Sequence, residues 1–102
     1  MSVLPTSDSS VAEARPFAER LARAKFRAWH RGTREADYMI GGFFDRYADG
    51  WGDDEMAWFE ALLDEDDVDV MAWGLQTQPV PERFQGALIE MMQRLDYVDI
   101  PG

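Results

Sequence analysis

The residues best suited to contact another molecule lie in one short stretch that joins two helix-like segments. Arg31, Gly32 and Glu35 bring together a guanidinium, a glycine and a carboxylate at the spacing Arg-Gly-x-x-Glu. The hydrophobic rhythm pauses here, so we expect these residues on display.

The same stretch has a second explanation, in which it only ends one helix and begins the next. Gly32 suits a helix end because it can adopt a left-handed backbone conformation without a Cβ clash. His30 and Arg31 would complement the negative end of the first helix, and Glu35 would complement the positive end of the second. Local physics alone favours this capping role over a contact role.

Patterns for catalysis or metal binding are absent from the sequence. His30 is the single histidine, and no serine or cysteine nucleophile stands beside it. The chain has no cysteine, which excludes disulfides and thiolate metal sites. The acidic run 64–69 lacks the glycine and glutamate that a calcium loop carries at its sixth and twelfth positions. We interpret this run as a solvated turn that caps a short helix, and we expect a non-enzyme with no catalytic residue and no metal site.

Charge is distributed unevenly along the 102 residues. The net charge is -10, yet residues 15–34 hold seven of the ten basic side chains and a single acid, Glu19. The first predicted helix is therefore basic, whereas the rest of the chain is acidic. The acidic part repels phosphates, which disfavours nucleic-acid binding, whereas surfaces of opposite charge suit a protein partner. We expect the basic helix to attract the acidic helices that follow it.

Five segments carry the spacing or the end signals of α-helices. Pro16 suits a first helical position, and Ala36, Met39, Ile40 and Phe43 recur on one helical face. The predicted helices cover about residues 16–31, 36–51, 53–63, 67–74 and 81–95. No strand alternation is evident, so we predict an all-α fold, a compact five-helix bundle. Its helical domain spans residues 15–96, between a flexible tail over 1–14 and a C-terminal tail over 97–102.

Several residues near the candidate site have predicted environments. Phe26 and Trp29 could pack in the core or form an apolar contact beside the Arg-Gly stretch, and the core is the favoured place for each. Asp37 is expected in solvent, opposite the apolar face of its helix. Gly41 and Gly42 interrupt that helix, which either close packing or a bend would explain. No apolar run is long enough to span a bilayer and no signal peptide is evident, so we expect a cytoplasmic protein without membrane insertion.

The order of several motifs resembles a known family. They are Arg31-Gly32-Thr33-Arg34-Glu35, Phe43-Phe44 with Tyr47, Asp53-Asp54-Glu55 with Phe59 to Leu63, Asp66 to Asp69 with Trp73, and the proline connection before Phe84. Together they resemble the SdhE-like assembly factors that promote covalent FAD attachment to the flavoprotein subunit of succinate dehydrogenase.

The resemblance implies a chaperone-like protein that docks on that flavoprotein subunit, and on the fumarate reductase flavoprotein where one is present. It implies that Arg31, Gly32 and Glu35 form the contact, with Trp29, His30 and Arg34 beside them. The protein would bind no cofactor stably, would act on the FAD of its partner, and would be a monomer.

Two other functions remain open from the sequence. An acidic regulatory module, antitoxin-like, would use the same charge pattern to bind a different protein. Nucleic-acid binding through the basic first helix would give an affinity that falls steeply with salt. The identity of the captured partner and the salt dependence separate these alternatives.

Overall fold

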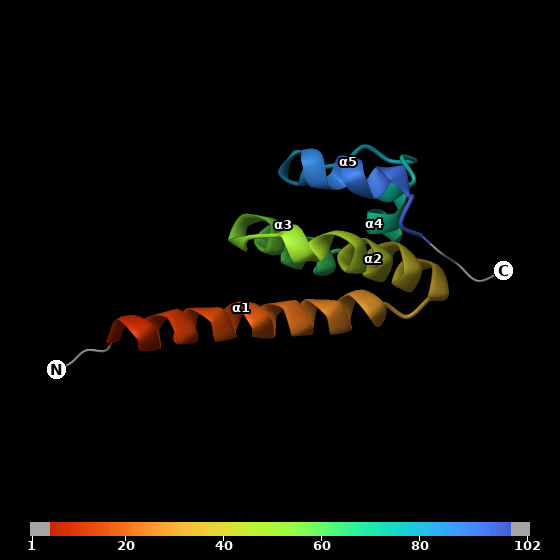
Figure 1. The fold of residues 1–102 in the computed structure, drawn as a ribbon. Coiled ribbons are helices and arrows are strands. Elements are labelled where there is room, and N and C mark those ends of the chain that lie inside the picture. The colour runs from red at the N-terminus through yellow and green to blue at the C-terminus, as the bar shows by residue number, and fades with distance from the viewer. Residues whose placement is uncertain (1–4, 99–102) are drawn as a thin grey trace.

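The computed structural model describes residues 5–98, and from residue 16 onward their side chains as well. Its elements are α1 (Pro5–Trp29), α2 (Arg34–Tyr47), the 3-10 turn η1 (Ala48–Gly50), α3 (Asp53–Leu63), α4 (Asp67–Gly74), the 3-10 turn η2 (Glu82–Phe84) and α5 (Ala87–Arg94). The described part holds five α-helices and no strand, which confirms the predicted all-α class. The long α1 lies along one side against α2 and α3, while α4 and α5 pack together on the other (Figure 1).

The start of α1 differs from the prediction. The helix begins at Pro5 instead of near Pro16, and Pro16 lies inside it. A proline within a helix removes one backbone hydrogen bond, but Ala12, Glu13 and Ala14 are strong helix formers and carry the helix across that gap. Residues 5–14 therefore have helical backbone, in contrast to the tail predicted over 1–14. Residues 1–4 lie outside the described residues.

An aromatic cluster on α2 forms the centre of the core. Phe43 is fully buried, as the helical spacing of α2 predicted. Its ring centroid lies 5.4–6.2 Å from those of five other aromatic side chains. They are Tyr47, Trp51, Trp58, Phe59 and Tyr97. Rings at such separations gain more than their buried area alone would give.

Ion pairs join the basic α1 to the acidic helices, as expected. Arg20 of α1 pairs with Glu60 and Asp53 of α3, and Lys25 pairs with Asp45 of α2. The hydrogen bond with Glu60, and the charges of both carboxylates, raise the pKa of Arg20 above its ordinary value. Water screens partly exposed ion pairs, so these contacts orient α1 on α2 and α3 more than they hold it there.

The last predicted helix is interrupted. A single helix was expected over about 81–95, but η2 ends at Phe84 and α5 begins at Ala87. Gly86, between them, has a φ of 141°, which is outside the helical region and suits only glycine. The break lets Phe84 enter the core, where its carbonyl accepts a hydrogen bond from Trp58 Nε1 at 3.2 Å.

The C-terminal tail was also predicted wrongly in part. Leu95 adopts a φ of 59°, which turns the chain back over α2. Tyr97 is consequently buried, and its hydroxyl donates to the Met92 carbonyl at 2.8 Å. An aromatic residue three positions beyond the end of α5 was the signal that the prediction overlooked. Residues 99–102 lie outside the described residues.

Tyr97 is expected to make stability sensitive to alkaline pH. Burial raises the pKa of its phenol above the ordinary value of 10.0. Above that pH the unfolded chain loses the proton while the folded chain keeps it, so stability present below it declines as pH rises. Tyr97→Phe should flatten this decline and cost about 1 kcal/mol for the hydrogen bond. Urea unfolding of both proteins at about pH 9 and pH 11 measures this; equal declines would contradict it.

Candidate functional site

The candidate site is the junction between α1 and α2, residues 30–33, with the hollow beside it. Gly32 is exposed and has a φ of 113°, so it turns the chain in a conformation that favours glycine. Thr33 then caps α2, because its hydroxyl oxygen accepts the Ala36 backbone N–H at 3.2 Å. The capping role predicted for this stretch is therefore real, although Thr33 supplies a cap that the prediction did not name.

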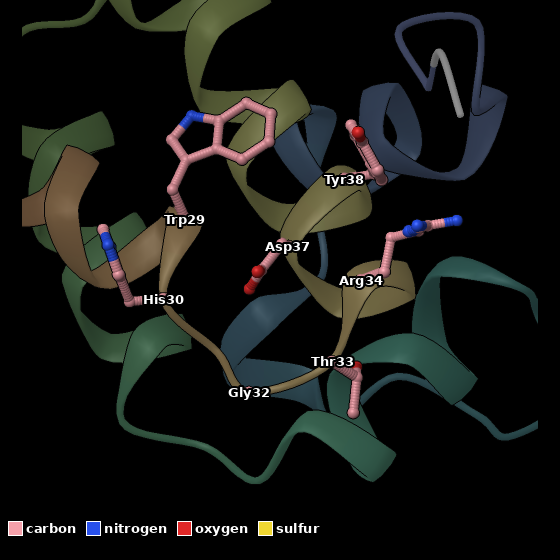
Figure 2. A pocket seen from close by; sticks show the side chains of 7 residues that line it. All are labelled: Trp29, His30, Gly32, Thr33, Arg34, Asp37 and Tyr38. Carbon is pink, nitrogen blue, oxygen red and sulfur yellow. The ribbon is translucent and has the colours of Figure 1, made fainter. Parts of the chain in front are cut away.

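A hollow of about 520 Å³ opens beside the junction. It is lined by Trp29, His30, Gly32, Thr33, Arg34, Asp37 and Tyr38 (Figure 2). Four of the predicted contact residues thus share one depression with three residues that were not predicted. Tyr38 could have been found from its spacing, because it follows Arg34 by four residues and so shares a helical face with it.

Arg31 does not line this hollow, and its side chain turns into the protein. The expectation that it is displayed is wrong, since the side chain is only 10% exposed. Its guanidinium donates to Asp67 Oδ1 at 2.7 Å, to the Leu63 carbonyl at 3.0 Å and to the Glu65 carbonyl at 3.1 Å. Arg31 therefore complements the carboxyl end of α3, whereas the sequence suggested the end of α1.

Asp37 also departs from its predicted environment. It was expected in solvent, but it is half-buried, and Figure 2 shows its carboxylate directed toward the junction. There Asp37 Oδ1 accepts the backbone N–H of Arg31 at 2.6 Å. A carboxylate in the first turn of α2 thus holds the chain that enters the junction. Both ends of Arg31, backbone and side chain, are fixed within the molecule.

Trp29 forms one wall of the hollow and explains one of the paired glycines. A Cβ at Gly41 would lie 2.4 Å from the indole Cδ2 of Trp29, so α2 can carry only glycine where the indole rests. Gly42 similarly faces the Tyr97 backbone, at 3.3 Å from its carbonyl oxygen. Close packing, one of the two explanations considered for the pair, is therefore present at both glycines. Trp29 is half-buried instead of lying in the core. Its indole meets the ring of Tyr38 edge to face, with 5.8 Å between the ring centroids.

His30 and Phe26 form an exposed pair on the outer side of α1. Phe26 was expected in the core but is 63% exposed, and its ring stacks on the imidazole at 3.9 Å. His30 Nδ1 lies 2.6 Å from the Phe26 carbonyl, to which the Nδ1–H tautomer of the imidazole donates. This bond satisfies a carbonyl at the end of α1, which is the capping role predicted for His30.

Arg34 and Glu35 are the charged groups that lie directly beside the junction and point outward. Both are exposed in the first turn of α2. Among the described residues, neither side chain forms a hydrogen bond or an ion pair. A guanidinium and a carboxylate therefore remain available to a polar partner. The surrounding geometry suits recognition, with an apolar wall, an open turn and two free charges.

The acidic run after α3 is largely occupied by arginines. Asp64 pairs with Arg27, and Glu65 pairs with Arg83. With Asp67 bound to Arg31, three of its carboxylates neutralise cations from elsewhere in the chain. Within the part of the chain whose side chains are described, no group of three metal-binding residues comes together. Of the helices between residues 5 and 98, none combines the length and the hydropathy that a membrane span requires.

Comparisons with known proteins place this chain in a family. The sequence model of a family described as "Flavinator of succinate dehydrogenase" matches residues 22–96. The FAD assembly factor SdhE of Acetobacter pasteurianus is 38% identical over 87 residues, which cover 85% of this chain and 79% of that protein. The chain belongs to this family of succinate dehydrogenase flavinators, which confirms the resemblance noted in the sequence.

More distant relatives include mitochondrial proteins named succinate dehydrogenase assembly factor 2. The Drosophila virilis protein is 25% identical over 89% of this chain, and the Mycosarcoma maydis protein is 32% identical over 79% of it. The matches cover 59% and 32% of those two proteins. These relatives do not favour the alternative of an acidic regulatory module.

Proposed function

We propose that this chain binds the flavoprotein subunit of succinate dehydrogenase and promotes the covalent attachment of FAD to it. Family membership supports a role in flavin attachment, and one structural observation supports the junction between α1 and α2 as the surface that binds the partner. That observation is the exposed junction at which Gly32 holds a left-handed turn directly before the free charges of Arg34 and Glu35. In this proposal the chain is an assembly factor and not an enzyme, and the flavoprotein forms the bond itself.

The junction would act by positioning. Gly32 allows the partner's backbone to approach the turn, while Arg34 and Glu35 offer charge-assisted hydrogen bonds. Trp29 and His30 supply apolar and aromatic surface beside them. Holding FAD and its acceptor side chain in a reactive arrangement removes orientation entropy from the barrier, which can be a large part of it.

Arg31 has a different part in this proposal from the one expected at first. Its guanidinium is engaged with Asp67 and two carbonyls of the same chain, so it contributes to the contact through the shape of the junction. Gly32, Glu35, Trp29, His30 and Arg34 then form the surface that meets the flavoprotein.

FAD would stay with the partner. The hollow is lined by a single basic side chain that is always charged, Arg34, which matches poorly the two phosphates of a dinucleotide. We therefore propose that the chain binds no cofactor stably, acts as a monomer in the cytoplasm, and serves the fumarate reductase flavoprotein where that enzyme occurs.

The test is in-gel flavin fluorescence of the denatured flavoprotein from cells with and without this chain, because only covalent FAD survives denaturation. We expect the signal to fall without the chain and to return with the wild type but not with Gly32→Val. Valine at a φ of 113° is strained by about 1–3 kcal/mol, which reshapes the turn, although a Cβ there meets no atom within 4 Å. Unchanged fluorescence at equal flavoprotein levels would contradict the proposal.

A further inference from the structure

We propose that Arg31 and Asp67 form an internal clamp that holds the junction in its binding shape, which makes Asp67 of α4 a positioning residue for partner binding. The inference rests on the proposed function and adds to it a residue distant in sequence from the junction. Asp67 is separated from Arg31 by 36 positions. Because Arg31 faces inward, its importance would come from what it fixes within the chain.

The clamp consists of three hydrogen bonds that the Arg31 guanidinium donates within the chain. Arg31 Nε binds the carboxylate that begins α4, and its two terminal nitrogens bind the carbonyls of Leu63 and Glu65 near the end of α3. The planar guanidinium fork can reach all three acceptors together, which the single ammonium of a lysine cannot do with the same geometry. One side chain thus ties the junction to the turn between α3 and α4.

Burial makes the arrangement sensitive to the loss of one partner. The Arg31 side chain is 10% exposed and that of Asp67 is 26% exposed. A charge left without its partner in such surroundings must find water, so we expect Arg31 to move outward when the Asp67 carboxylate is removed. Gly32 follows directly in the chain, and the turn it makes would move with Arg31.

A neighbouring ion pair provides a matched comparison. Arg27 also extends from α1 to the same turn, where it binds Asp64 Oδ1 at 2.7 Å and the Leu63 carbonyl at 3.2 Å. This pair is more exposed, at 38% for Arg27 and 70% for Asp64, and Arg27 lies within α1 instead of in the junction. Removing it should disturb α1 and leave the turn at Gly32 in place.

The experiment uses the full chain with Asp67→Ala, Arg31→Lys, the double variant, and two controls. Asp64→Ala removes the neighbouring ion pair, and Asp69→Ala removes another exposed acid from the first turn of α4. For each folded variant we would measure the Kd for the purified flavoprotein and the amide chemical shift of Gly32 in the free chain. We expect Asp67→Ala to weaken binding by about tenfold or more and to shift Gly32, with both controls within about twofold of wild type.

The double variant tests whether Asp67 acts through Arg31. We expect it to bind no more weakly than the worse of its two single variants, because both changes open the same clamp. Additive losses would mean that Asp67 touches the partner directly, and would overturn the inference. An unmoved Gly32 resonance, or wild-type affinity in Asp67→Ala, would overturn it as well.

The two proposals can fail separately. If Gly32→Val loses affinity while Asp67→Ala binds like wild type, the clamp is wrong and the proposed function stands. If the wild-type chain does not bind the flavoprotein at all, the proposed function is wrong. The Gly32 resonance still decides in that case whether the clamp holds the junction.

Discussion

Phe43→Ala is expected to lower the free energy of unfolding by about 3–5 kcal/mol, the usual cost of emptying a buried phenylalanine site. Phe43 has no exposed surface. Five aromatic side chains surround its ring, and they come from α2, from α3, from the connection between η1 and α3, and from the segment after α5. The cavity cannot collapse easily, because those rings are held by their own neighbours. The free energy of unfolding of a domain of this size is about 5–15 kcal/mol, so the variant should be close to unfolding.

Urea unfolding followed by circular dichroism measures this loss, with Phe26→Ala as the matched control. Phe26 is 63% exposed and loses mainly its stacking contact with His30, so its removal should cost less than about 1 kcal/mol. Similar costs for the two variants would contradict the assignment of Phe43 to the centre of the core.

Glu35→Ala is expected to weaken flavoprotein binding by about 10–100-fold while leaving the fold intact. A hydrogen bond to a charged group contributes about 1.5–3 kcal/mol, which corresponds to that range of affinity. Within the chain Glu35 is exposed and has a favourable position in the first turn of α2, which gives only about 0.3–1 kcal/mol. The effect should therefore appear in binding and hardly in unfolding.

Glu90→Ala controls for the helix-end contribution, since Glu90 is an exposed acid in the first turn of α5. Titration of each folded variant with purified flavoprotein gives the affinities, and urea unfolding gives the stabilities. If both variants bind alike, Glu35 is no contact residue. If Glu35→Ala unfolds the domain instead, the capping explanation of the junction is the correct one.

The helices were predictable wherever their own sequence decides them. The apolar spacing of α2 located its buried face, and the acids before Met56 and before Val70 marked where α3 and α4 begin. The failures lie where tertiary contacts or backbone strain decide. The sequence pattern places Gly86 inside a helix, but its positive φ breaks that helix. Tyr97 is buried only because the chain reverses at Leu95.

The candidate site shows the same division. The pause in hydrophobicity and the glycine located the junction, and Arg34 and Glu35 lie exposed, as that pause predicted. The direction of Arg31 depends on Asp67 and on two carbonyls that only the fold brings near. No periodicity can predict such a contact, because residues between the two positions form separate helices.

The contact between Trp29 and Gly41 sets a limit on how this protein can be engineered. Replacing helical glycines with alanine is a standard way to raise thermal stability, through about 1 kcal/mol of helix propensity. At position 41 the added Cβ would lie 2.4 Å from the indole of Trp29, so the wall of the hollow would have to move. Thermostable versions intended to keep the junction intact must take their substitutions elsewhere, for example at Gly50, where a Cβ meets no atom within 4 Å.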